Sequence, residues 1–204
     1  LEASQKRLAL FELEAPPLPP LPSLEETRPR SAREVGERAQ ALWAVAARAG
    51  GLEREAAVEL LQARGLWSCA TPAEQNYLLE AEHEPAEAAA FAHRKEALAV
   101  LLWALGKTDL LGPPTRPAEL DPMTTVLRRH DAASFLDKAA LRPTEQLLDE
   151  ACANTRVHAA LALLERAGKS HATLKSEVAA ERHLALSWLI RYPRGEWDQL
   201  AGEG

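Results

Sequence analysis

Eight charged or imidazole side chains stand within stretches that otherwise have the composition of a helical core. They are Arg94, Glu96, Arg142, Arg156, His158, Glu181, Arg182 and His183. Arginines can hold an anionic group, and histidines or carboxylates can move protons. Because burial of an unpaired charge is costly, we expect these side chains to meet, either as a network that locks helices together or as the lining of an acid–base pocket. We favour the structural network, which predicts mutual pairs and no cavity.

The elements that position these residues are predicted to be helices. Forty of the 204 residues are alanine, and leucine, glutamate and arginine are also abundant. All four are strong helix formers, and no stretch alternates apolar and polar residues as a strand would. Capping boxes begin helices after Ser31 and Thr71, where Glu34 and Glu74 stand three positions later. The sequence therefore predicts an all-α fold of six to eight helices in one compact domain.

One predicted helix is apolar on every side and should lie at the centre of the domain. It is the second half of a long helix that starts at Pro85 and ends at Gly106, and its residues 97–105 carry no charge. The other predicted helices cover residues 32–48, 54–64, 72 onward, two short segments between 122 and 136, 143–168 and 174–191.

The first 27 residues form a proline-rich arm, and the helical domain follows at residues 28–204. Leu8, Leu10, Phe11 and Leu13 are expected to be apolar anchors, and the segment from Pro16 to Pro22 should be extended polyproline II. Such a segment can dock in an aromatic groove of another protein, or it can act as a strap on its own domain. We favour the strap.

Two short motifs resemble the end of a phosphate-binding loop without its context. Gly106-Lys107-Thr108 and Gly168-Lys169-Ser170 each end a predicted helix, whereas a phosphate-binding loop follows a strand and opens a helix. We expect each glycine to be a helix C-cap and each lysine to face the negative end of the helix dipole.

The pair His130-Asp131 resembles part of a metal-dependent phosphohydrolase site. In such all-helical enzymes a His, a His-Asp pair and a distant Asp hold a divalent cation. The first ligand would be His83 or His93, and the last would be Asp137, Asp149 or Asp198. Because the pair follows two arginines at a predicted helix end, we interpret it as solvated charge, and we predict no metal and no cofactor.

Charge and cysteine content exclude several classes of function. Thirty acidic residues against 24 basic ones give a net charge of −6, which disfavours nucleic-acid binding. The longest apolar run has nine residues, too few to span a membrane. Cys69 and Cys152 are too few for a disulfide scaffold, so we predict a reducing, cytoplasmic location. Each could be a nucleophile, but Cys152 stands in an apolar helix, where cysteine is usually a small core residue.

Several stretches occur together in this order along the chain. They are Arg30-Ser31-Ala32, Gly65-Leu66-Trp67, residues 101–106, Leu141-Arg142-Pro143 with Asp149-Glu150, residues 156–159, residues 181–189 and Trp197-Asp198. Together they resemble an uncharacterised bacterial family, domain of unknown function 4272, over residues 28–198. The resemblance implies a bacterial cytoplasmic protein without an assigned activity.

Two functions from different classes are compatible with this sequence. The first is a non-enzymatic protein-binding module whose acidic surface covers a basic partner, for example an immunity-type protein that masks a toxin. The alternative is an enzyme or small-anion binder that uses the eight polar residues. We favour the binding module because complete catalytic motifs such as Gly-x-Ser-x-Gly and His-Glu-x-x-His are missing.

Overall fold

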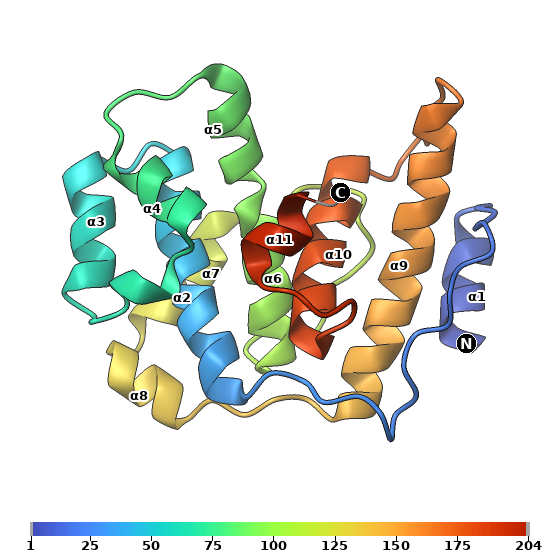
Figure 1. Cartoon of the computed structure of the whole chain (residues 1–204), viewed down its shortest axis with the longest axis horizontal. Helices are drawn as coiled ribbons and strands as arrows, with labels where there is room; N and C mark the ends of the chain where they lie inside the picture. The colour runs from blue at the N-terminus through green and yellow to red at the C-terminus, as the bar shows by residue number, and fades with distance from the viewer. Residues whose placement is uncertain (1, 203–204) are drawn as a thin grey trace.

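All regular secondary structure of the described residues is helical (Figure 1). The computed structural model describes residues 2–202, which form eleven α-helices and one 3-10 turn and no strand. The helices are α1 (Glu2–Leu10), α2 (Ala32–Ala49), α3 (Arg54–Gln62), α4 (Pro72–Leu79), α5 (Pro85–Ala92), α6 (Arg94–Ala104), α7 (Leu120–Arg128), α8 (Ala132–Asp137), α9 (Thr144–Arg166), α10 (Ser176–Ile190) and α11 (Trp197–Gly202); the 3-10 turn is Trp67–Cys69. The predicted all-α fold is confirmed. None of the described helices combines the length and apolar character needed to cross a bilayer.

The helices outnumber the six to eight expected, partly because the long helix predicted from Pro85 to Gly106 is divided at His93. The His93 amide donates to the Ala90 carbonyl at 3.2 Å, and the Glu96 amide donates to the His93 carbonyl at 2.8 Å. Both bonds span three residues, which tightens the backbone and separates α5 from α6. The break places His93 and Arg94 at a corner between the two helices.

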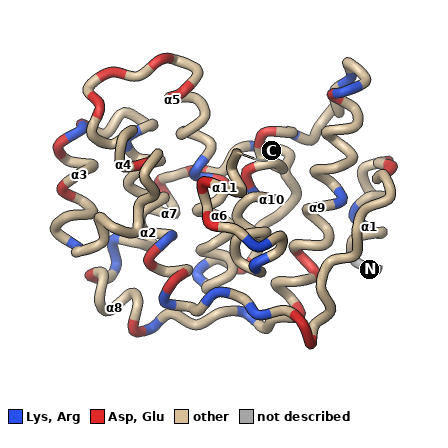
Figure 2. Tube along the Cα trace, viewed as in Figure 1, with Lys and Arg blue, Asp and Glu red and all other residues tan. Residues whose placement is uncertain are grey.

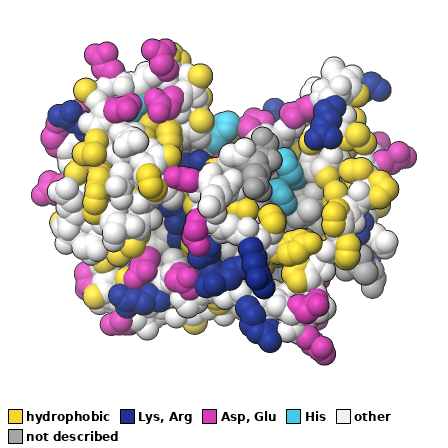
Figure 3. Space-filling view, in the orientation of Figure 1, with side chains coloured by type: hydrophobic (Ala, Val, Ile, Leu, Met, Phe, Trp, Pro, Cys, Tyr) yellow, Lys and Arg dark blue, Asp and Glu magenta, His cyan; other side chains and the backbone are white. Residues whose placement is uncertain are grey.

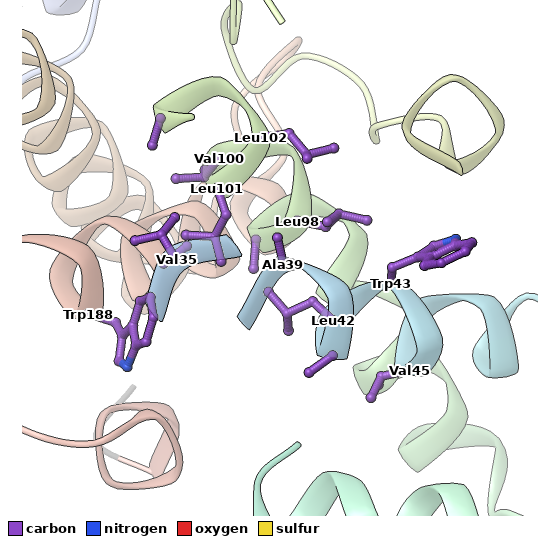
Figure 4. Packing of buried hydrophobic residues seen from close by; sticks show 14 of the residues in the cluster. Val35, Ala39, Leu42, Trp43, Val45, Leu98, Val100, Leu101, Leu102 and Trp188 are labelled. Carbon is purple, nitrogen blue, oxygen red and sulfur yellow. The ribbon is translucent and has the colours of Figure 1, made fainter. Parts of the chain in front are cut away.

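Helix α6 is the central element of the core, as predicted. It packs against α2 on one side and α10 on another, and Figure 4 shows leucines of α6 interleaved with side chains of α2. Leu98, Leu101 and Leu102 are completely buried, as is Leu42 of α2. A helix covered in this way holds the residues at its N-terminus in fixed positions against α10.

The helix caps form as predicted, both at N-terminal and at C-terminal helix ends. Ser31 and Thr71 each complete a capping box with the glutamate three positions later. Gly106 and Gly168 have φ angles of 64° and 68°, a conformation that glycine adopts without strain at the end of a helix. Both Gly-Lys motifs therefore terminate helices and do not open them, which rules out the geometry of a phosphate-binding loop.

The N-terminal segment begins with a helix that the sequence analysis did not predict. Helix α1 lies alongside α9 in Figure 1, and Leu8 and Leu13 are buried against the Val157–Leu161 part of α9. After α1 the proline-rich stretch runs without regular secondary structure toward α2. The Tyr192 hydroxyl donates to the Pro20 carbonyl at 3.2 Å, so this stretch contacts the helical domain.

Candidate functional site

Two ion pairs connect the N-terminus of α6 to α10. Arg94 Nη1 donates to both carboxylate oxygens of Glu181, at 2.6 and 2.9 Å. Two residues further along α6 and one residue further along α10, Glu96 Oε2 accepts from Arg182 Nε and Nη2 at 3.3 and 3.2 Å. The side chains of Glu96 and Arg182 are 1% and 5% exposed. The structure thus brings four of the eight predicted polar residues together as two neighbouring pairs.

The inner pair also holds the loop between α6 and α7. The second carboxylate oxygen of Glu96 accepts the Ala118 amide, and Arg182 Nη1 donates to the Gly112 carbonyl at 3.0 Å. These bonds satisfy both charged groups in the interior, where a missing partner would be costly. The Glu96–Arg182 pair therefore fixes three segments of the chain relative to one another.

His158 of α9 and His183 of α10 stack face to face beside the outer pair. Their ring centroids are 4.8 Å apart, and the Thr155 hydroxyl lies 3.2 Å from His183 Nδ1. Burial, and to a smaller extent the neighbouring His158, lower the pKa of His183 to about 4. Burial also lowers the pKa of His158. Both imidazoles are neutral at pH 7.

A cavity of about 570 Å³ opens between these residues and the C-terminal helix. Its polar lining includes His93, Arg94, His158, Glu181 and His183, and apolar side chains from α10 and α11 complete its walls. Figure 3 shows histidine side chains at the surface on either side of α11. The structure therefore contains both features that the sequence analysis treated as alternatives, mutual ion pairs and a cavity beside them.

The formal charge of the side chains that line this cavity is slightly negative. Burial raises the pKa of Glu181, and the charge and hydrogen bonds of Arg94 act in the opposite direction. The Glu177 carboxylate also lines the cavity. Two carboxylates and one guanidinium give a formal charge of −1 while the stacked histidines are neutral, so the cavity does not present an excess of positive charge to an anion.

The remaining two predicted residues lie away from this cavity. Arg142 Nε donates to the Trp103 carbonyl and its Nη2 to the Thr108 carbonyl, both at 2.7 Å, so it caps the C-terminal end of α6. Arg156 lines a separate cavity of about 340 Å³ beneath the proline-rich stretch. Neither contributes to the cluster around Glu181.

Other buried charges were missed by the sequence analysis. Arg38 of α2 forms a two-pronged ion pair with Glu74 of α4, with one N–O distance of 2.6 Å, and stacks on Trp197. Arg30 stacks on Trp188 and donates to its carbonyl at 3.1 Å. The signal for Arg38 was its position one turn after Val35 on the apolar face of α2. Glu74 was recognised only as a capping residue, although it performs both roles.

His130 and Asp131 do not form a metal site with the other predicted ligands. The Asp131 carboxylate caps α8, accepting the Ser134 amide at 2.8 Å and the Ser134 hydroxyl at 2.9 Å. Within residues 2–202, one group of three possible ligand side chains has its ligand atoms within 4.8 Å of one another, and it consists of Glu80, His83 and Glu87. Of the residues predicted for metal binding, this group contains only His83.

The two cysteines lie outside the cavity as free thiols. Burial raises the pKa of Cys69, and the charge of Glu37 raises it further, so its thiol is not activated as a nucleophile. Cys152 Sγ lies 3.7 Å from the Ser4 hydroxyl, at the contact between α9 and α1.

The stacked histidines predict a loss of stability in mild acid. In the unfolded chain a histidine takes up a proton near pH 6.5, whereas folded His183 resists it until about pH 4. The folding free energy that depends on neutral His183 is therefore complete above pH 6.5 and is lost progressively as pH falls toward 4. Between pH 8 and pH 5 it should fall by about 2 kcal/mol.

Urea unfolding at these two pH values measures this loss. His183→Asn keeps a polar atom near Thr155 and removes the titration, so its free energy of unfolding should change less between pH 8 and pH 5. If the free energy of unfolding changed equally in the two proteins, the loss of stability in acid would not come from His183.

Comparisons with known proteins identify the family but no activity. No curated protein and no solved structure matches this chain significantly. A family model described as "Domain of unknown function (DUF4272)" matches residues 2–200, nearly the whole chain. The match includes α1 and the proline-rich stretch as well as every residue of the cavity up to Leu200. The chain therefore belongs to the family called domain of unknown function 4272.

Proposed function

We propose that the cavity between α5, α9, α10 and α11 binds a small polar molecule. The observation that carries this proposal is the convergence of a half-buried Arg94–Glu181 pair and two neutral, stacked imidazoles on one open cavity of about 570 Å³. Titratable groups with shifted pKa values in a concave site are typical of ligand-binding and active sites. Their helices are held rigidly by the core, which keeps the site in a fixed shape.

The lining favours a neutral or amine-bearing ligand over an anion. A neutral imidazole offers one donor and one acceptor nitrogen, and Glu177 and Glu181 offer only acceptor oxygens while ionised. Leu184, Leu200 and Pro193 provide apolar contacts for the carbon skeleton.

Filling the cavity should abolish binding. We expect small amines or polyols to raise the melting temperature of the chain, and carboxylates and phosphates to leave it unchanged. A ligand at ten times its Kd stabilises the fold by about 1.4 kcal/mol, or about 3–5 °C in a chain of this length. Ala90→Trp places an indole in the cavity from the exposed side of α5 and should remove the shift.

Ala89→Trp is the matched control, because Ala89 is equally exposed but does not line the cavity. The proposal fails if no amine or polyol raises the melting temperature of the unmodified chain. It also fails if the ligand shifts the melting temperatures of the two tryptophan variants by the same amount.

A second candidate is the protein-binding module suggested by the acidic composition, acting in the cytoplasm. The specific observation is a run of four glutamates, Glu80, Glu82, Glu84 and Glu87, on the loop between α4 and α5 and the first turn of α5. Figure 2 marks acidic residues along this part of the chain, and Figure 3 shows acidic side chains gathered over the same projecting end of the molecule. Such a surface would steer a basic partner, such as a toxin neutralised by an immunity-type protein.

Isolation of the tagged chain from its native cells tests this second candidate. A basic protein should elute in constant proportion with the unmodified chain and be depleted with the double variant Glu82→Gln/Glu84→Gln, since fewer charges remain to attract it. A chain that elutes alone, or a partner retained equally by both proteins, would contradict the role of this loop.

A further inference from the structure

A buried histidine without hydrogen-bond partners stands between two exposed carboxylates at the start of α5. His83 Nδ1 lies 3.6 Å from a Glu80 oxygen and 3.4 Å from a Glu87 oxygen. The His83 side chain is only 7% exposed, whereas those of Glu80 and Glu87 are 55% and 42% exposed. Among the residues that the structure describes, neither ring nitrogen of His83 has a hydrogen-bond partner. Buried polar atoms are almost always satisfied, so this ring lacks a partner that the site should supply.

Aromatic stacking holds the ring of His83 in place. It lies on Tyr77 with centroids 3.9 Å apart, and the other side of Tyr77 stacks on Phe91 at 4.0 Å. Tyr77 is itself buried in the core. The imidazole is therefore oriented by the fold, independently of Glu80 and Glu87. A ring fixed in this way keeps its Nδ1 aimed between the two carboxylates.

The separations between His83 Nδ1 and the two carboxylates match those around a small divalent cation, and all three ligand atoms lie within 4.8 Å of one another. Zinc binds histidine nitrogen and carboxylate oxygen at about 2.0–2.2 Å, and a tetrahedral arrangement separates such ligands by about 3.4 Å. The observed separations of 3.4 and 3.6 Å exceed the usual length of an N–H···O hydrogen bond and agree with this value.

The neighbouring charge also favours a cation. Residues 80–87 carry four glutamates and no basic residue other than His83. A site that combines imidazole with carboxylates suits zinc and related transition metals, whereas calcium and magnesium prefer oxygen ligands alone.

We propose that Glu80, His83 and Glu87 form a zinc site that closes the loop between α4 and α5. Glu80 follows the last residue of α4, and Glu87 lies in the first turn of α5, so the ion joins the two helix ends. Three protein ligands leave the fourth tetrahedral position for water. This site is separate from the cavity beside Glu181 and does not depend on its function.

Zinc titration of the full chain after treatment with a chelator tests this proposal. Calorimetry should show one zinc bound per chain and no comparable binding of magnesium. His83→Phe retains an aromatic ring to stack on Tyr77 but removes the nitrogen ligand, and it should weaken zinc binding by about 100-fold. Glu87→Gln changes a surface residue, so it leaves folding intact while weakening binding similarly.

The double variant Glu82→Gln/Glu84→Gln is the control, because it removes two charges from the same loop and no proposed ligand. Its dissociation constant for zinc should lie within a few-fold of that of the unmodified chain, although the same variant should lose a basic protein partner. The proposal is overturned if the unmodified chain binds no zinc, or if His83→Phe and Glu87→Gln bind it as tightly as the control.

Discussion

The interface between α6 and α10 depends on two ion pairs. Arg94 of α6 pairs with Glu181 of α10, and Glu96 of α6 pairs with Arg182 of α10. Glu96 is completely buried, and its charge is tolerated only because Arg182 and the Ala118 amide complete its hydrogen bonds. Charge pairs of this kind accept few alternative registers, since a shift of one residue would leave each group without its partner. The pairs therefore set how the central helix sits against α10, while the leucines of α6 supply most of the burial.

The same pairs explain how a packed interface can border a binding cavity. The Glu96–Arg182 pair lies inside the fold, whereas the Arg94–Glu181 pair lies at its edge and lines the cavity. His93 reaches this edge because the helix breaks between α5 and α6. Structural and functional interpretations of these residues are thus not exclusive, because the groups that fix the helices also give the cavity its polarity, while burial in the same packed structure keeps its histidines neutral.

The sequence predicted what depends on local chemistry and missed what depends on tertiary partners. The capping boxes at Ser31 and Thr71, the glycine helix ends and the buried α6 follow from neighbouring residues, and all were confirmed. The pairing of Glu96 with Arg182 joins residues 86 positions apart, so the sequence indicated that both needed partners without saying which. Helix α1 escaped prediction because its apolar residues gain their stability from α9. The sequence analysis left a pocket as the less favoured alternative, because a cavity depends on how α5, α6, α9, α10 and α11 meet.

The most direct test of this account is a double-mutant cycle on Glu96 and Arg182, measured by urea unfolding. Glu96→Gln and Arg182→Met should each lower the free energy of unfolding by about 3–5 kcal/mol, because each leaves the other charge buried without its partner. The double variant leaves no unpaired charge, so it should lose clearly less than the sum of the two single losses. Losses that simply add, or single losses below about 1 kcal/mol, would contradict the claim that this pair governs the interface.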